Sequence, residues 1–482
     1  MKRKEFGILM PVFSLPSCGG IGSMGAEAYS FVDWLVEANQ HYWQVLPLTV
    51  TDGSSPYMGF SSFAGNHLLI SLEKLKSEGL ITQVPVWRGK TGRIDYSWVE
   101  EQHLSALREA YENHKHQEEV QDFISKNEWV KDYAMFMSLK DYFHKPLQEW
   151  DEDIRTRQKK AINYYKGLLS DEINFHIFIQ YKFFQQWFEL KEYANYKGVE
   201  IIGDVPIYVS SNSADVWGEP GLFKVNEKTL CAIKVAGCPP DAYAEDGQYW
   251  GNPVYDWTYH EKTDYKWWIS RIRHLLKIVD VLRIDHFRAF DRYWEISAKE
   301  KTAKNGMWVD GPKMRLFDML NKKIPNARII AEDLGTIDDG VRNLLKETGY
   351  PGMKVMIFGL TEENEHTPQN WPENAVGYTS THDSEPIRAA IENLSREQYS
   401  RVAKMLKIFT PTEIGMCAIR AAYDTRARIV IIPIVDVLSL GFEGRINTPG
   451  TVGPENWSWR AETESITETI ASKLASLVQY YE

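Results

Sequence analysis

Three acidic residues, each placed at the end of an apolar or β-branched run, are the strongest candidates for chemistry: Asp285, Glu332 and Asp383. Cleavage of a glycosidic bond with retention of configuration needs one carboxylate as nucleophile and a second as proton donor and acceptor. A third carboxylate can bind sugar hydroxyls and favour the flattened ring of the oxocarbenium-like transition state. If the fold brings them together, these residues predict chemistry at the anomeric carbon of a sugar.

The setting of each carboxylate suggests its role. Asp285 stands two residues after Arg283, and in an extended strand their side chains share a face. The guanidinium would then favour the ionised form that a nucleophile requires, although from this stretch alone a structural ion pair is an equal alternative. Glu332 follows apolar residues that would raise its pKa and let it donate a proton. Asp383, beside His382, is suited to bind sugar hydroxyls.

Eight short apolar or β-branched runs predict the scaffold that positions these residues. They alternate with helical patterns such as residues 26–39, and several end in charged or polar residues. This alternation predicts an α/β fold, a (β/α)8 TIM barrel that spans residues 1–482 as a single catalytic domain with large inserted subdomains. The predicted strands are residues 6–10, 42–48, 199–207, 279–287, 328–335, 352–358, 376–383 and 427–436.

Two insertions interrupt the alternation. Residues 80–198 are charged and aromatic without a strong strand pattern, which predicts a mainly helical insertion. Residues 211–257 are rich in Gly, Pro and Trp and predict a loop-rich lid over the active-site cleft, with a long ordered surface loop as the alternative. Tyr57 follows the second predicted strand and is either a platform for a sugar ring or a side chain that packs its own loop.

Composition narrows the class of function. The formal net charge of −11 disfavours nucleic acid as a partner, and no run approaches the ~20 apolar residues of a membrane span. The four cysteines form no Cys-x-x-Cys pair, which favours a cytoplasmic location, although the first 18 residues also resemble a lipoprotein signal. Without a His-x-x-x-His motif or a compact ligand cluster, we expect neither a metal nor a cofactor.

Short motifs spread over essentially the whole chain form a recognisable set. They include Ser55-Pro56-Tyr57, Gly203-Asp204-Val205-Pro206, Pro239-Pro240-Asp241, Trp250-Gly251-Asn252-Pro253, Arg283-Ile284-Asp285-His286-Phe287-Arg288, Ala331-Glu332-Asp333-Leu334-Gly335, Thr381-His382-Asp383 and Asn447-Thr448-Pro449-Gly450-Thr451. The set resembles the 4-α-glucanotransferases (amylomaltases, or disproportionating enzymes) of the α-amylase clan. The resemblance implies that Asp285 is the nucleophile, Glu332 the acid/base and Asp383 the transition-state stabiliser. The substrate-binding residues that it implies are Tyr57, Asp241, Trp250, Arg283, His286, His382 and Asn447.

The activity implied by this resemblance is a retaining transfer. Asp285 would capture a segment of a 1,4-α-D-glucan, and the 4-OH of glucose or of another glucan, deprotonated by Glu332, would accept it. Maltooligosaccharides and α-1,4-glucans would be the substrates, and the oligomeric state stays open. The first alternative is a hydrolase that uses the same carboxylates with water as acceptor. The second is a glucan-binding module with an inactive site.

Overall fold

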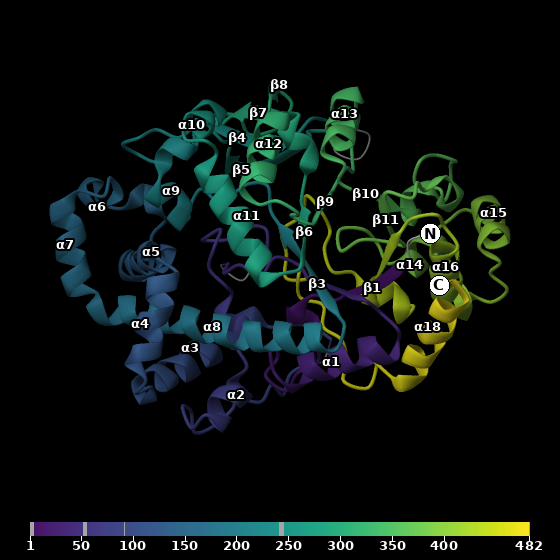
Figure 1. The fold of residues 1–482 in the computed structure, drawn as a ribbon, viewed down its shortest axis with the longest axis horizontal. Coiled ribbons are helices and arrows are strands. Elements are labelled where there is room, and N and C mark those ends of the chain that lie inside the picture. The colour runs from purple at the N-terminus through teal and green to yellow at the C-terminus, as the bar shows by residue number, and fades with distance from the viewer. Residues whose placement is uncertain (1–3, 52–54, 91, 241–244, 482) are drawn as a thin grey trace.

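A closed barrel of eight parallel strands lies at the centre of the computed structural model, which describes residues 4–51, 55–90, 92–240 and 245–481 (Figure 1). Each predicted strand overlaps one barrel strand, so the predicted (β/α)8 fold is confirmed. In chain order the barrel strands are β1 (Glu5–Leu9), β2 (Tyr42–Gln44), β3 (Glu200–Val205), β6 (Val281–Ile284), β9 (Ile329–Ala331), β10 (Gly352–Val355), β11 (Ala375–Tyr378) and β12 (Ile429–Pro433).

Neighbouring strands in the barrel are also consecutive among these eight, and β12 closes the ring against β1. The close pairing of β1 with β2 requires a glycine, because a Cβ at Gly7 would lie 2.5 Å from the Cβ of Tyr42. One cluster of buried side chains comes entirely from the barrel strands. Its members are Leu9, Tyr42, Ile202, Val281, Ile330, Met353, Val355, Val376, Tyr378 and Ile431. Side chains of this kind make the barrel interior a packed core rather than a pore.

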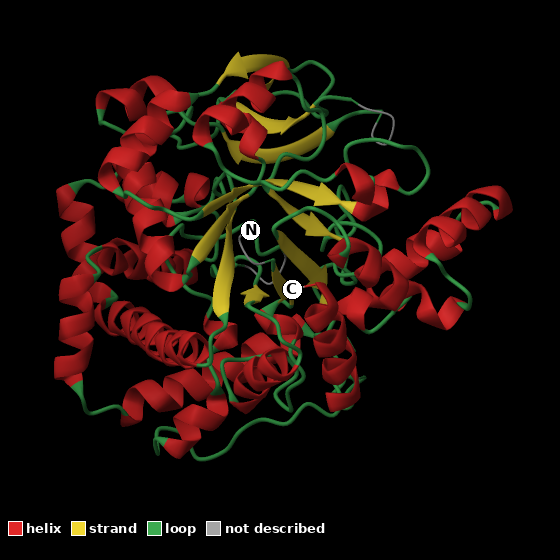
Figure 2. Ribbon diagram, turned by 45° about the vertical axis from the view of Figure 1, so that its right-hand side comes forward, coloured by secondary structure: helices red, strands yellow, loops and turns green. Residues whose placement is uncertain are grey.

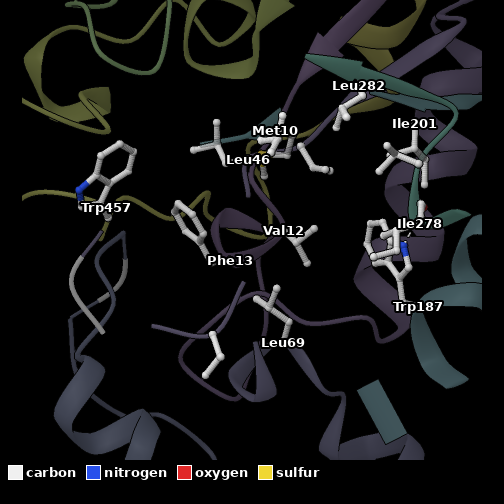
Figure 3. Packing of buried hydrophobic residues seen from close by; sticks show 14 of the residues in the cluster. Met10, Val12, Phe13, Leu46, Leu69, Trp187, Ile201, Ile278, Leu282 and Trp457 are labelled. Atoms are coloured by element: carbon white, nitrogen blue, oxygen red, sulfur yellow. Dashed lines mark hydrogen bonds between the residues drawn. The ribbon is translucent and has the colours of Figure 1, made fainter. Parts of the chain in front are cut away.

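A larger core extends from the barrel strands to the surrounding helices, and Figure 3 shows part of it. Trp187 lies beside Ile278 there, and its indole Nε1 donates to the Ile278 carbonyl over 2.9 Å. The indole therefore buries its apolar surface without leaving its N–H unpaired. This contact joins the long helix of the insertion to the helix that leads into β6.

The insertion between β2 and β3 is mainly helical, and its helices lie together on one side of the barrel in Figure 1. Its longest helix buries an apolar stripe that includes Phe178 and Trp187 against the core. From residue 80 onward, the helices of this region are α3 (Tyr96–Asn113), α4 (Gln117–Lys126), α5 (Trp129–Phe143), α6 (Glu152–Arg155), α7 (Lys159–Leu168) and α8 (Ser170–Tyr196).

The remaining helices surround the barrel or cap its ends, as the ribbon in Figure 2 shows. Within the described ranges, none of the helices is both long enough and apolar enough to cross a membrane. These remaining helices are α1 (Ala26–Glu37), α2 (Leu72–Ser77), α9 (Ala214–Gly218), α10 (Trp257–Lys262), α11 (Lys266–Ile278), α12 (Met314–Lys323), α13 (Asp339–Thr348), α14 (Ile387–Glu392), α15 (Arg396–Leu406), α16 (Ile414–Tyr423), α17 (Ile434–Val437) and α18 (Glu468–Tyr481).

The segment at residues 211–257 contains two strands and the short helix α9 as well as loops. β4 (Lys234–Cys238) pairs with β5 (Gln248–Pro253) and, further along the chain, with β7 (Arg292–Ser297). With β8 (Met307–Asp310) they form a four-stranded antiparallel sheet, visible above the barrel in Figure 2. The local pattern gave no sign of the pairing with β7, because β7 lies outside the segment.

Candidate active site

Arg283, near the end of β6, contacts two carboxylates at the rim of the barrel. Its Nη2 lies 3.3 Å from Oδ1 of Asp285, and its Nη1 lies 2.6 Å from Oδ2 of Asp204. Asp204 stands directly opposite Arg283 in the pairing of β3 with β6. The predicted pair of Arg283 with Asp285 is therefore present, but Asp204 makes the shorter contact. The Arg283 side chain is 4% exposed and that of Asp285 is 25% exposed, so Asp285 stays accessible to a substrate.

The charges around Asp285 do not simply favour its ionised form. Burial raises the pKa of Asp285 well above its ordinary value, and the carboxylates of Asp204, Glu332 and Asp383 raise it further, while Arg283 lowers it. Arg283 lowers the pKa of Asp285, as expected, but burial outweighs this effect, and Arg283 is shared with Asp204. Burial also raises the pKa of Glu332. Burial thus raises the pKa of both acids, and the charge of Glu332 contributes to the raised pKa of Asp285.

Glu332 follows β9, the barrel neighbour of β6, and its carboxylate is bound by two backbone N–H groups. His286 N donates to Oε2 over 2.6 Å, and Leu334 N donates to Oε1 over 2.7 Å. These bonds and Arg283 lower the pKa of Glu332, but burial outweighs them, so its pKa is raised, as its apolar neighbours predict. His286 has a left-handed backbone with a φ of 50°, which is uncommon for a residue other than glycine.

Asp383 is the acid of the site whose pKa is lowered. Its Oδ1 accepts a hydrogen bond from Asn447 Nδ2 over 2.7 Å, and its Oδ2 lies 3.4 Å from Nε2 of His382. Burial opposes ionisation, but His382, Asn447 and Arg283 together lower the pKa of Asp383 to about 2. Asp383 is therefore an anion at neutral pH, which suits a group that faces a developing positive charge.

Tyr57 connects opposite sides of the site. Its hydroxyl donates to Oδ2 of Asp204 over 2.6 Å and lies 2.8 Å from Nε2 of His382. Its ring stacks on the His382 ring, with centroids 5.6 Å apart and planes 14° apart. These contacts cross the barrel rim, so Tyr57 does more than pack its own loop.

The four-stranded sheet reaches the site through Trp250 of β5. The Trp250 ring meets the His286 ring edge to face, with centroids 4.9 Å apart. Burial, with a contribution from Arg288, lowers the pKa of His286 to about 3, so this imidazole is neutral. Asp241, the remaining predicted substrate-binding residue, lies outside the described residues.

Two residues of the site were not among the predicted ones. Asp204 has the signal that identified the other acids, a carboxylate at the end of an apolar run, but its bond to Arg283 depends on which strands are neighbours. Trp457 lies with its ring centroid 5.6 Å from that of Tyr57 and 6.0 Å from that of His382. It comes from a C-terminal segment without a local signal. In the part of the chain that the structure describes, no group of three or more His, Cys, Asp or Glu side chains could hold a metal ion.

Comparison with known proteins identifies relatives over the full length of the chain. The family model described as 4-alpha-glucanotransferase matches residues 10–466. The 4-alpha-glucanotransferase of Clostridium butyricum is 42% identical over 484 residues, which cover 98% of this chain and 99% of that protein. That of Aquifex aeolicus (strain VF5) is 43% identical over 464 residues, 95% of each chain. The solved structure of amylomaltase from Streptococcus agalactiae in complex with acarbose is similar with a TM-score of 0.97 and 41% identity, and 99% of each chain is covered.

Proposed function

The chain belongs to the 4-alpha-glucanotransferase family, and from this premise we propose that it transfers a segment of a 1,4-α-D-glucan through a covalent intermediate on Asp285. The observation that carries the assignment is the geometry at the ends of β6 and β9. There the proposed nucleophile is followed by His286, whose backbone N–H binds the proposed acid/base, Glu332. Both acids have raised pKa values, and Arg283 acts on both.

In the first half-reaction, the carboxylate of Asp285 attacks the anomeric carbon of the donor sugar. The glycosidic C–O bond breaks, and Glu332 gives its proton to the departing oxygen, which releases a shortened glucan. In the second half-reaction, the Glu332 carboxylate takes the proton from the 4-OH of an acceptor. The acceptor oxygen then attacks the anomeric carbon and frees Asp285, so configuration is retained.

The other residues of the site support this sequence of steps. The Asp383 carboxylate, oriented by Asn447 and charged at neutral pH, would stabilise the oxocarbenium-like transition state. Trp250 and Tyr57 would offer aromatic surface to sugar rings at opposite sides of the rim. The full set that we propose to bind substrate is Tyr57, Asp241, Trp250, Arg283, His286, His382 and Asn447.

Glucose and maltooligosaccharides are the proposed acceptors, and the segment at residues 211–257 is the proposed cover of the cleft. Its Trp250 contacts His286, next to the proposed nucleophile, where it would help to exclude water. We also infer a cytoplasmic location, which is supported by the exposed cysteine thiols of Cys18 and Cys231.

Incubation of the purified protein with maltotriose tests the proposal. Transfer predicts glucose together with a ladder of longer maltooligosaccharides, while the total number of reducing ends stays constant. Reducing ends that rise without a ladder would mean that water is the acceptor, and the transferase assignment would then be wrong. Unchanged maltotriose that nevertheless binds would indicate a glucan-binding protein with an inactive site.

A further inference from the structure

Asp436 is a fully buried carboxylate that the proposed mechanism does not use. It lies in α17, directly after β12, and is 0% exposed. Its Oδ2 accepts hydrogen bonds from the hydroxyls of Thr379 and Ser380 over 2.5 and 2.6 Å. Its Oδ1 accepts one from Ile387 N over 2.7 Å. One carboxylate thus binds three donors from another part of the chain.

These three donors flank the segment that carries the proposed stabiliser. Thr379 and Ser380 directly follow β11, and Ile387 is the first residue of α14. Between them lie residues 381–386, which include His382 and Asp383. Asp436 therefore holds both ends of this segment from α17, which directly follows β12, the neighbour of β11. Within the segment, Thr381 N donates to Ser384 Oγ over 2.9 Å, which keeps the turn folded between its two fixed ends.

We propose that Asp436 is a positioning residue, which fixes residues 381–386 so that Asp383 meets the reacting sugar. The inference rests on the role proposed for Asp383 above. Among the described residues, no cation acts on the pKa of Asp436, which is lowered only by its hydrogen bonds and raised by burial to about 6. A buried unpaired charge is costly for stability. The Asp436 carboxylate is useful at this position because its two oxygens accept all three hydrogen bonds in one fixed arrangement.

A double-mutant cycle tests the proposal through transfer from maltotriose. Asp436→Ala alone should lower kcat at least ~10-fold and change KM by less than ~3-fold, because the contacts of Asp383 strengthen only in the transition state. In an Asp383→Asn background, the same Asp436→Ala change should cost less than ~3-fold, since the group that it positions is already lost. A glycosyl fluoride donor keeps the slow variants measurable, because its leaving group needs little protonation.

Two further variants separate positioning from general destabilisation. In Asp436→Asn, the amide oxygen can still accept from Ile387 N, and the amide N–H groups can donate to the hydroxyls of Thr379 and Ser380. Asp436→Asn should therefore retain most of the kcat that Asp436→Ala loses. Asp280→Ala is the matched control at the opposite end of the barrel. Asp280 accepts from Ile201 N over 2.8 Å and pairs with Lys191 over 2.9 Å. Its loss should lower the melting temperature and leave kcat within ~2-fold.

The outcomes are distinguishable. Two results would show that Asp436 acts only through stability and would overturn the inference. In the first, the loss of kcat in the double variant equals the product of the losses in Asp383→Asn and Asp436→Ala. In the second, Asp280→Ala loses as much kcat as Asp436→Ala. An impaired Asp383→Asn beside an unimpaired Asp436→Ala would overturn this inference alone. A fully active Asp383→Asn would refute the proposed stabiliser and the positioning role together.

Discussion

The backbone N–H of His286 donates to Oε2 of Glu332 over 2.6 Å. This bond links the residue after the proposed nucleophile to the proposed acid/base, across the neighbouring strands β6 and β9. It is made with a left-handed backbone at His286, where φ is 50°. Such a conformation costs free energy in a residue with a side chain and persists only where its surroundings enforce it. The two acids are therefore held relative to each other by backbone as well as by side chains.

Replacement of Glu332 should separate the two half-reactions. Glu332→Gln keeps the size of the side chain and removes the proton donor, so kcat on maltotriose should fall by ~10²–10⁴. A glycosyl fluoride should still form the intermediate, which then stalls because no base activates the acceptor. Intact-protein mass spectrometry should detect an adduct on Asp285, and Asp285→Asn, treated in the same way, should show none. An adduct that accumulates in Asp383→Asn and not in Glu332→Gln would mean that their roles are reversed.

Removal of the charge on Asp204 should shift the pH dependence of the reaction. The Asp204 carboxylate raises the pKa of Asp285 and shares Arg283 with it. Asp204→Asn therefore lowers the pKa of Asp285, and the acid limb of the profile of kcat/KM against pH should move to lower pH. The rate itself should fall, because Arg283 and Tyr57 lose a charged partner. A shift of the acid limb to higher pH would contradict this account of the site.

Local pattern was sufficient for the barrel and insufficient for contacts between distant elements. Each barrel strand is a short apolar or β-branched run, and several of these runs end in polar residues, so the strands and the carboxylates Asp285, Glu332 and Asp383 could be predicted together. The ion pair between Asp204 and Arg283 could not be predicted, because it depends on β3 and β6 being neighbours in the barrel. The sheet formed by β4 and β7 was missed for the same reason. In both cases the partner lies far away in the chain.

Buried histidines should make the protein sensitive to mild acid. Burial lowers their pKa values to about 3 or 4, whereas an exposed histidine has a pKa of about 6.5. The unfolded chain therefore binds protons below pH ~6.5 that the folded chain does not, and stability should fall as the pH drops from 6.5 toward 5. The histidines concerned are His67, His103, His260, His274, His286 and His366.

A single substitution measures the share of one histidine in this acid sensitivity. His274 bonds the Phe63 carbonyl through Nε2 over 2.8 Å, and a glutamine at this position can still donate to it. His274→Gln should reduce the slope of unfolding free energy against pH by up to ~1.4 kcal/mol per pH unit, the contribution of one proton. Denaturant unfolding between pH 5 and 7 gives the slope. An unchanged slope would show that His274 titrates alike in the folded and unfolded chains.

Asp436 should lower stability at neutral pH even though it positions the active site. Its pKa is raised from 3.8 to about 6 by burial, so its protonated form favours the folded state. Its contribution to stability is therefore greatest below pH ~4 and is lost as the pH rises through 6.

Asp436→Asn resembles the protonated acid at every pH. The difference in stability between the variant and the natural protein should be smallest below pH ~4 and should grow with pH, so that the variant is more stable at pH 7.5 by at most about 3 kcal/mol. Comparing the two proteins at each pH cancels the contribution of the histidines. An Asp436→Asn protein less stable than the natural one at pH 7.5 would show that the three hydrogen bonds outweigh the cost of the buried charge.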